Sequence, residues 1–254
     1  MQKDELFYQC YDALYFSKNY DEEVNLIVSL AKKFYPEKIK NVLEIGSGTG
    51  NHTMHLAIYD FSVTAIDTDE KMILHALKKI TKTKFPQVKL INTSVEKLKE
   101  KNFDFALAGF NVINYLPDIN SMLSFFKAIS LRLKKNGLLI FDCWNGIAAV
   151  IDPPKSKTIN GKMGDNLISC TVSSETDFMK QKTKLTYLIK ITGEKEKIID
   201  SGNFSFEQWL WTPMEINHCL KSSGFKVLKC SRNLQPEIQA KETDWKIMFL
   251  CKKT

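Results

Sequence analysis

Short apolar runs alternate with amphipathic stretches over residues 1–150 of the chain. Continuous apolar runs are typical of buried parallel strands, whereas apolar residues three and four positions apart are typical of helices that cover a sheet. Because strands and helices alternate, we expect an α/β fold with a Rossmann-like, doubly wound sheet. The pattern predicts strands at residues 40–45, 61–66, 88–92, 103–108 and 138–142, and helices at residues 22–34, 51–59, 70–80 and 119–133.

The pattern becomes rich in β structure after the fifth predicted strand. Pro153 and Pro154 interrupt the chain, and polar turns then separate apolar runs at residues 167–173, 185–191 and 203–211. These runs predict antiparallel β-hairpins inserted after strand five. The remaining sequence predicts a helix at residues 213–222, a strand at residues 225–230, a loop around Pro236 and a strand at residues 245–252.

These patterns divide the chain into four segments. We expect a helical lid at residues 1–38, a core at residues 39–150 and an antiparallel insertion at residues 151–212. Residues 213–254 are expected to complete the core sheet at an antiparallel edge. A chain of 254 residues with 44% hydrophobic content is ample for one such core with an accessory layer.

One stretch after the first predicted strand indicates a ligand. Residues 42–50 read Val-Leu-Glu-Ile-Gly-Ser-Gly-Thr-Gly, in which Glu44 precedes Gly46, Gly48 and Gly50. Glycines allow a tight turn and let the backbone approach a ligand closely. A dinucleotide-binding turn requires a further glycine where this chain has Asn51. The acid at position 44 also opposes a diphosphate, so the loop favours a cationic or zwitterionic nucleoside ligand.

Asp67 is the second marker of a nucleoside site. It follows the second predicted strand, about twenty residues after the first glycine, where doubly wound folds place a carboxylate on ribose hydroxyls. The alternative is that Asp67 caps the helix at residues 70–80. We favour the ribose role, because the loop and the acid occur together.

The E-x-G-x-G-x-G loop resembles that of the class I S-adenosylmethionine-dependent methyltransferases. The aromatic stretch at residues 11–23 resembles the Y-D-x-x-Y and K-x-Y elements of a subgroup that contains nucleotide-linked aminosugar N-methyltransferases and glycine N-methyltransferase-like enzymes. The resemblance covers nearly the whole chain and is weakest beyond residue 165. It implies S-adenosylmethionine as cofactor and methylation of a small molecule, preferentially the amine of a nucleotide-linked deoxyaminosugar.

The resemblance also implies which residues contact the cofactor. Family members usually place an aspartate at the position of Ser94 to receive the adenine amino group, and a serine hydroxyl can still accept that hydrogen bond. The tyrosines of the lid would cover the cofactor, although each could instead pack on the sheet. The implied cofactor residues are Tyr11, Tyr20, Glu44, Gly46, Gly48, Gly50, Asp67, Thr68, Met72, Ser94, Val95, Ala108 and Phe110.

Asn111 and Tyr115 are the implied catalytic residues, since they follow the fourth strand at the ligand-binding edge. Tyr115, another hydroxyl or a water would accept the proton that an ammonium must lose. Either Trp209 or Trp211 could orient a substrate, with core packing expected for at least one of them. The implied substrate contacts are Tyr15, Asp142, Trp144, Asn145, Glu207 and Trp209.

Composition limits the partners. The formal charge is +7, yet lysines are scattered among glutamates, so we expect a solvated surface and no nucleic-acid binding. Six cysteines without a C-x-x-C pair suggest reduced thiols, and His52 with His55 lacks a third metal ligand. We therefore expect no metal. No stretch suggests export or membrane insertion, so we expect a cytoplasmic protein. A homodimer is left open.

Other functions remain to be separated from this one. Sugar O-methylation would require a base more firmly, and the sequence places none of its four histidines near the fourth predicted strand. A nicotinamide-dependent oxidoreductase would use the same alternation of strands and helices, but Asn51 in place of glycine opposes it. A protein that binds the cofactor without turnover is the third alternative.

Overall fold

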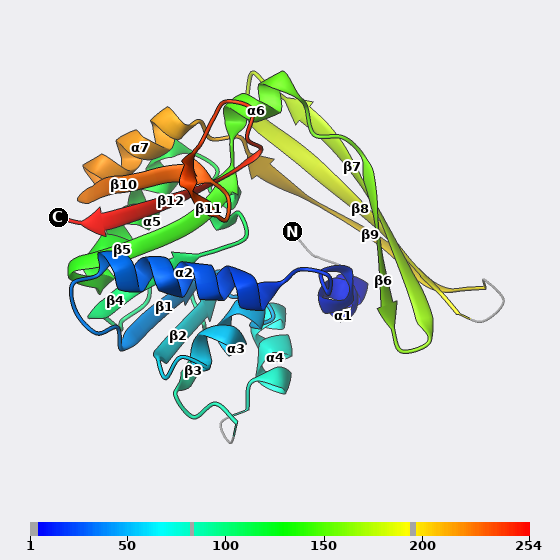
Figure 1. Ribbon diagram of the computed structural model, residues 1–254. Coiled ribbons are helices and arrows are strands. Elements are labelled where there is room, and N and C mark those ends of the chain that lie inside the picture. The colour runs from blue at the N-terminus through cyan, green and yellow to red at the C-terminus, as the bar shows by residue number, and fades with distance from the viewer. Residues whose placement is uncertain (1–4, 82–83, 194–196) are drawn as a thin grey trace.

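The computed structural model describes residues 5–81, 84–193 and 197–254, so the first four residues of the expected lid lie outside the description. Figure 1 shows a central twisted sheet and a second sheet that extends away from it. The central sheet has the order β11-β10-β12-β5-β4-β1-β2-β3. Its parallel strands are β1 (Asn41–Ile45), β2 (Ser62–Asp67), β3 (Val88–Asn92), β4 (Phe103–Ala108) and β5 (Leu133–Trp144).

An antiparallel edge completes the central sheet beside β5. Strand β12 (Lys246–Lys253) pairs with β5 and β10 (Phe225–Arg232), and β11 (Gln235–Gln239) pairs with β10. The parallel-dominated α/β fold is therefore confirmed. Strand β11 replaces the loop expected around Pro236, which an edge strand tolerates because one side of its backbone needs no partner.

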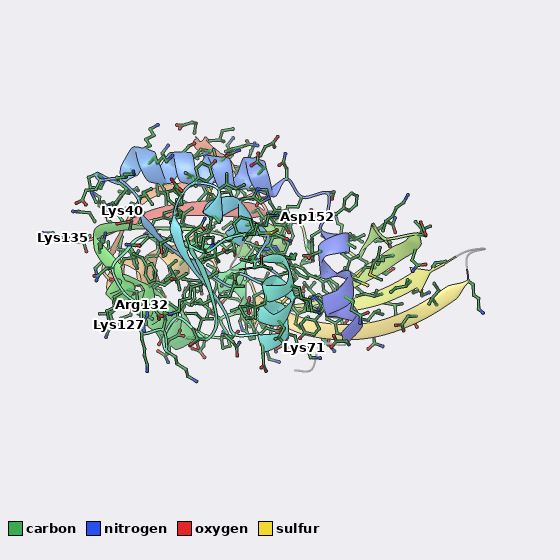
Figure 2. All side chains as sticks on the ribbon, turned by 90° about the horizontal axis from the view of Figure 1, so that it is seen from below. Lys40, Lys71, Lys127, Arg132, Lys135 and Asp152 are labelled. Carbon is green, nitrogen blue, oxygen red and sulfur yellow. The ribbon has the colours of Figure 1, made fainter. Side chains whose placement is uncertain are left out.

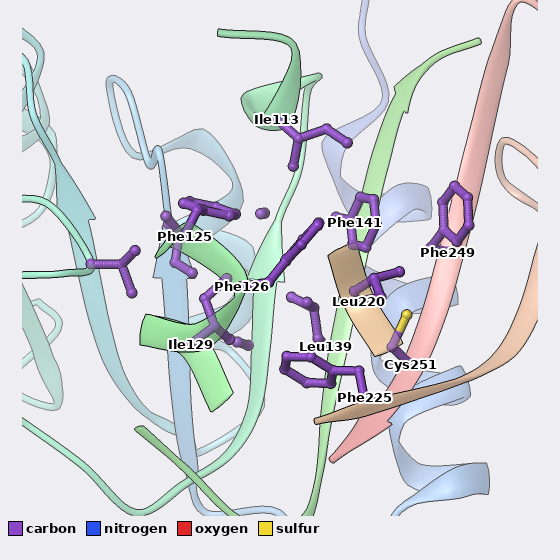
Figure 3. Packing of buried hydrophobic residues seen from close by; sticks show 14 of the residues in the cluster. Ile113, Phe125, Phe126, Ile129, Leu139, Phe141, Leu220, Phe225, Phe249 and Cys251 are labelled. Atoms are coloured by element: carbon purple, nitrogen blue, oxygen red, sulfur yellow. The ribbon is translucent and has the colours of Figure 1, made fainter. Parts of the chain in front are cut away.

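Helices cover both faces of the central sheet. Two apolar cores result, one beneath α2 and α3 and the other beneath α5 and α7. Figure 3 shows the second core, where the rings of Phe141 and Phe249 stack with centroids 5.0 Å apart. The helices are α2 (Tyr20–Phe34), α3 (Asn51–Ala57), α4 (Glu70–Lys79), α5 (Ile119–Arg132), α6 (Gly146–Ile151), α7 (Pro213–Ser222) and the 3₁₀ turn η1 (Val112–Tyr115).

The second sheet is antiparallel and has the order β6-β7-β8-β9. Helix α1 (Glu5–Leu14) packs on it and encloses a third apolar core, in which the rings of Phe7 and Phe204 lie 4.3 Å apart. The helix thus lies between the two sheets (Figure 1). The strands are β6 (Lys157–Met163), β7 (Asn166–Asp177), β8 (Lys182–Thr192) and β9 (Ile198–Trp209).

Most predicted elements are present, and the differences are not confined to β11. Strand β6 and helix α6 were not predicted, and β5 begins at Leu133, before the turn expected at residues 134–137. Residues 134–137 form an irregular stretch within β5, between the paired residues Leu133 and Leu138, where Asn136 has a φ of +62° and Gly137 lies against the backbone of Lys134. Within the hairpin block, residues 194–196 lie outside the described part of the chain.

Candidate functional site

A cavity of about 1190 Å³ lies at the carboxyl ends of the parallel strands, and residues of α1 and of the second sheet line its other side. Ligands of open α/β sheets bind at this edge. The cavity brings together fourteen of the residues expected at the site, from widely separated stretches of the chain. These are Tyr11, Tyr15, Tyr20, Gly46, Gly48, Asp67, Thr68, Met72, Phe110, Asn111, Tyr115, Trp144, Glu207 and Trp209.

The glycine loop between β1 and α3 borders this cavity at Gly46 and Gly48. Gly46, Gly48 and Gly50 all have positive φ angles. A Cβ atom on Gly46 would lie 2.5 Å from Val112 Cγ2, and one on Gly50 would lie 2.6 Å from Ile80 Cδ1. A Cβ atom on Gly48 would meet nothing within 4 Å. Of the three glycines, Gly48 is therefore the one at which an added side chain would enter open space.

Asp67 holds this loop in shape at the end of β2. Its Oδ2 accepts a hydrogen bond of 2.7 Å from the Gly48 backbone N–H, and its Oδ1 accepts one of 2.8 Å from Asp69 N. Asp69, not Asp67, is the N-cap of α4, so the capping alternative is wrong. Each carboxylate oxygen can accept more than one hydrogen bond, which fits ribose hydroxyls at this wall.

The opposite wall is a strained turn after β4. Phe110 and Asn111 have φ angles of +67° and +63°, which residues other than glycine rarely adopt. Asp142 stabilises the turn, because its Oδ1 accepts from the Asn111 backbone N–H at 3.2 Å. Its Oδ2 accepts from Lys246 Nζ at 2.6 Å. Such strain at the ligand-binding edge of a sheet is typical of functional sites.

The comparisons with known proteins agree with this geometry. Residues 42–137 match the sequence family described as a methyltransferase domain. The core thus matches a methyltransferase domain. Two putative methyltransferases, YqeM of Bacillus subtilis and one of Geobacillus sp. strain WCH70, are each 28% identical over 54% of this chain. The matched segment spans about half the length of each, 53% and 56%.

Solved structures with the same fold cover nearly the whole chain. DesVI of Streptomyces venezuelae has a TM-score of 0.81 at 14% identity, with 100% of both chains covered. KedS8 of a Streptoalloteichus species, described as a sugar N-methyltransferase, has a TM-score of 0.78 at 14% identity and covers 100% of this chain and 96% of its own.

A third structure, CalS10 of Micromonospora echinaspora, is described as an amino pentose methyltransferase with bound S-adenosylmethionine. Its TM-score is 0.75 at 15% identity, with 100% of this chain and 99% of its own covered. At these identities the likeness shows the fold alone. Together with the domain match, it supports S-adenosylmethionine as the cofactor.

The cavity fits such a cofactor. The open backbone at Gly48 and the carboxylate of Asp67 lie on one wall. Ser47 Oγ, on the same loop, is buried without a hydrogen-bond partner, as expected for an atom that a ligand completes. Tyr11 and Tyr20 border the cavity from the amino-terminal segment.

Seven expected site residues lie outside the cavity lining. Glu44 is buried, its Oε2 accepts from Thr53 Oγ1 at 2.6 Å, and burial raises its pKa to about 8. Its carboxyl therefore joins β1 to α3 instead of facing the cavity. The other six are Gly50, Ser94, Val95, Ala108, Asp142 and Asn145.

Packing and capping account for several of these placements. Ala108 and Val95 belong to the apolar core on the α5 face, and Ile80 covers Gly50. Asn145 is the N-cap of α6, because its Oδ1 accepts from Ile147 N at 3.1 Å. The packing alternative is correct for Trp211, which is 5% exposed.

Asp12 and His52 have contacts at the site but had no role there in the sequence-based prediction. Asp12 on α1 accepts hydrogen bonds from Thr49 Oγ1 at 2.6 Å, Asn51 Nδ2 at 3.0 Å and Lys79 Nζ at 2.7 Å. Burial opposes ionisation of Asp12, but these donors outweigh it and lower its pKa. Asp12 is the acid of the Y-D-x-x-Y element, and that element could have indicated it from the sequence.

His52 is the second. It lines the cavity, and a Cβ atom on Gly109 would lie 3.7 Å from its Cε1 atom. The argument that no histidine lies near the fourth strand is therefore wrong. His52 Nε2 lies 3.0 Å from Glu23 Oε2 and 3.4 Å from Lys18 Nζ. Burial lowers the pKa of His52, so its imidazole is neutral at pH 7.

Among the described residues no cluster of three or more histidine, cysteine, aspartate or glutamate side chains could hold a metal ion. The six cysteines are free thiols. Across the same part of the chain, no helix combines the length and apolar character that crossing a membrane requires.

Proposed function

We propose that this protein transfers a methyl group from S-adenosylmethionine to the amine of a small molecule, preferentially a nucleotide-linked deoxyaminosugar. The observation that carries the proposal is the open backbone of Gly48 beside the carboxylate of Asp67, inside a cavity closed by α1 and the second sheet. KedS8 and CalS10 are described as acting on sugars, which supports a sugar acceptor.

The cavity also has positive charge on the side away from the glycine loop. Lys157 on β6 and Lys184 on β8 line it, and both come from the second sheet. Neither has a carboxylate partner within ion-pair distance among the residues described, whereas Lys182 pairs with Glu207 at 2.6 Å. Cationic side chains here support a substrate that carries phosphate. The second sheet is thus the substrate-binding layer in this proposal.

The bound cofactor supplies a methyl group on a positively charged sulfur, and the C–S bond breaks as the C–N bond forms. The contribution of the chain is to exclude water and to hold the amine in line, which can account for roughly 7–11 kcal/mol of the barrier. Asn111 and Tyr115 lie at the wall where the acceptor would be held. Tyr15, Trp144, Glu207 and Trp209 enclose the acceptor side.

An ammonium substrate must lose a proton before its nitrogen can attack. Partial desolvation in the cavity raises the pKa of the half-exposed Tyr115, so its phenol keeps its proton at neutral pH and orients the acceptor. His52 lines the same cavity with a neutral imidazole, which is the form that accepts a proton. We therefore assign the acceptor role to His52 instead of Tyr115.

Calorimetry with S-adenosylhomocysteine, S-adenosylmethionine and nicotinamide dinucleotides tests the cofactor. A bound ligand at a hundredfold its Kd stabilises the fold by about 2.7 kcal/mol, which thermal unfolding would detect. We expect this with the two sulfur nucleosides and not with the dinucleotides. Asp67→Asn should weaken S-adenosylhomocysteine binding at least tenfold, whereas Asp165→Asn, at an exposed acid, should not.

Labelled methyl transfer to aminosugar nucleotides and to their hydroxyl counterparts tests the acceptor. Transfer to the amine only would support the proposal. Transfer to the hydroxyl only would favour the O-methyltransferase alternative. Binding of the cofactor without transfer to any acceptor would indicate a non-catalytic protein. Absence of binding heat with either sulfur nucleoside, in folded protein, would exclude the proposal.

A further inference from the structure

Two buried amide side chains in the cavity have oxygen atoms without a hydrogen-bond partner. Asn111 is 7% exposed and Gln208 is 4% exposed. Asn111 Oδ1 and Gln208 Oε1 are both buried and unpartnered, and both residues line the cavity. Buried polar atoms in folded proteins nearly always have a partner, so these two oxygens are positioned for a ligand.

The local structure keeps the two side chains close to Tyr115. Asn111 immediately precedes η1, and Tyr115 ends it. Gln208, on β9, forms a side-chain hydrogen bond with Tyr115, and its Oε1 has no partner. Asn114 Nδ2 donates to Trp209 O at 2.6 Å and joins η1 to β9.

The backbone of Asn111 is also held in place. Its N–H donates to Asp142 Oδ1 at 3.2 Å, and its φ of +63° suits asparagine better than most residues. Asp142 is in turn bonded to Lys246 Nζ at 2.6 Å. The side-chain oxygen of Asn111 is therefore carried by a turn that hydrogen bonds hold in place.

The chemistry of these atoms defines what they can bind. A carboxamide oxygen accepts hydrogen bonds and cannot donate. A primary amine offers two N–H donors and can satisfy both oxygens, whereas a hydroxyl has one donor and leaves one oxygen unpaired. We propose that Asn111 and Gln208 form an amine-recognition pair that selects a nitrogen over an oxygen acceptor. The role of the pair in choosing the acceptor rests on the proposed methyl transfer, but the test of binding does not.

An aromatic wall next to the pair offers a competing explanation for cation binding. The ring of Tyr115 lies 5.5 Å from that of Phe206, and the ring of Phe206 lies 5.2 Å from that of Tyr187. Aromatic faces attract any cation, including one without N–H groups. The amine-recognition pair differs because it requires N–H donors.

Three small probes separate these possibilities. Methylammonium has N–H donors, tetramethylammonium has the same charge without them, and methanol has a single O–H. Each is titrated into the full chain without a methyl donor, while NMR records the ¹⁵N-labelled side-chain amides of Asn111 and Gln208. We expect saturable shifts with methylammonium, and at least tenfold weaker responses with the other two.

Substitutions identify the atoms involved. Gln208→Met removes one acceptor at similar size and should weaken the methylammonium response of Asn111 at least fivefold. Gln235→Met, at an exposed glutamine of β11, should leave it unchanged. Asn111→Asp keeps an acceptor, suits the same φ and should tighten methylammonium binding, which covers the case that Gln208→Met does not fold.

An equal response to tetramethylammonium would overturn the inference in favour of the aromatic wall. An equal response to methanol, or no saturable response to methylammonium, would overturn it outright. Because no methyl donor is present, these outcomes are independent of calorimetry with S-adenosylhomocysteine. The amine-recognition pair and the methyltransferase proposal can therefore fail separately.

Discussion

At the residue scale, the three glycines of the loop lack side chains for different reasons. Gly46 and Gly50 face Val112 and Ile80, whereas Gly48 faces open cavity. We expect Gly48→Ala to weaken S-adenosylhomocysteine binding at least tenfold, because its methyl group enters the space of the ligand. Its positive φ should also reduce stability by roughly 1 kcal/mol.

Gly46→Ala is the matched comparison, since its Cβ atom would lie 2.5 Å from Val112 Cγ2. It should lower the melting temperature more than Gly48→Ala does. Calorimetry and thermal unfolding of both variants measure the two effects. Wild-type affinity in Gly48→Ala would show that the ligand does not approach this loop.

His52 and Tyr115 should affect the pH profile of methyl transfer differently. Because burial lowers the pKa of His52 below its usual 6.5, turnover should fall as pH drops through that lowered value. His52→Gln should remove this acidic limb. Tyr115→Phe should lower kcat while keeping the limb and the affinity for S-adenosylhomocysteine. An acidic limb that persists unchanged in His52→Gln would assign the proton acceptor to another group.

The sequence could predict those site residues whose spacing carries a local signal. The glycine loop and Asp67 were found in this way, because both lie on one strand–turn–helix–strand unit. Gln208 was not found, since only the pairing of β9 with its neighbours and the contact with η1 bring it to the cavity. His52 was placed away from the fourth strand because sequence separation conceals its contact with Gly109.

At the scale of elements, α1 is held on the core by polar contacts. Tyr8 OH donates to Asp69 Oδ2 at 3.1 Å, and Lys71 Nζ lies 2.7 Å from Glu5 Oε2. Figure 2 shows Lys71 on α4, beside α1. Asp12 adds the link to the glycine loop itself. This arrangement couples the position of α1 to the shape of the loop.

Asp12→Asn tests this coupling. The amide loses the charge that pairs with Lys79 and can replace only one of the two acceptor oxygens. We expect a three- to tenfold loss of S-adenosylhomocysteine affinity and faster amide hydrogen exchange in α1. Asp165→Asn serves as the control. Unchanged exchange in α1 would show that Asp12 does not hold this helix.

Elements with a clear apolar pattern were predicted most accurately. β3, β4 and α7 were predicted with the correct bounds, since each has a clear apolar pattern. β6 was missed because Gly161 is its one buried residue, so no alternation marks it. A Cβ atom on Gly161 would lie 2.4 Å from Ala13 O, so tertiary contact with α1 places this strand.

At the scale of the whole molecule, α1 belongs to both layers. Its apolar face packs on the second sheet, and its polar residues contact the core. The segment that follows it contributes Lys18 and Glu23, which pair with each other beside His52. These charges lie where the amino-terminal segment meets the core, so their ionisation should affect the stability of the entire fold.

Glu23 gives this stability a defined pH dependence. Burial opposes its ionisation, but hydrogen bonds from His52 and Lys18 outweigh burial and lower its pKa from 4.5 to about 2. The unfolded chain therefore binds this proton at higher pH than the folded chain does. The stabilisation is present above pH 4.5 and is lost as pH falls toward 2. A shift of this size corresponds to roughly 3 kcal/mol at neutral pH.

Urea unfolding of the wild type and Glu23→Gln at several pH values measures this contribution. We expect the wild type to be more stable by about 2–3 kcal/mol at pH 7, with the difference shrinking below pH 4.5. Glu237→Gln removes an exposed partner of Lys229 and should change nothing measurable. The pKa of His52 is also lower in the folded chain than its usual 6.5, so protonation of the unfolded chain further reduces stability as the pH falls below 6.5. A difference between wild type and Glu23→Gln that stays constant from pH 7 to pH 3 would show that Glu23 acts through packing instead of charge.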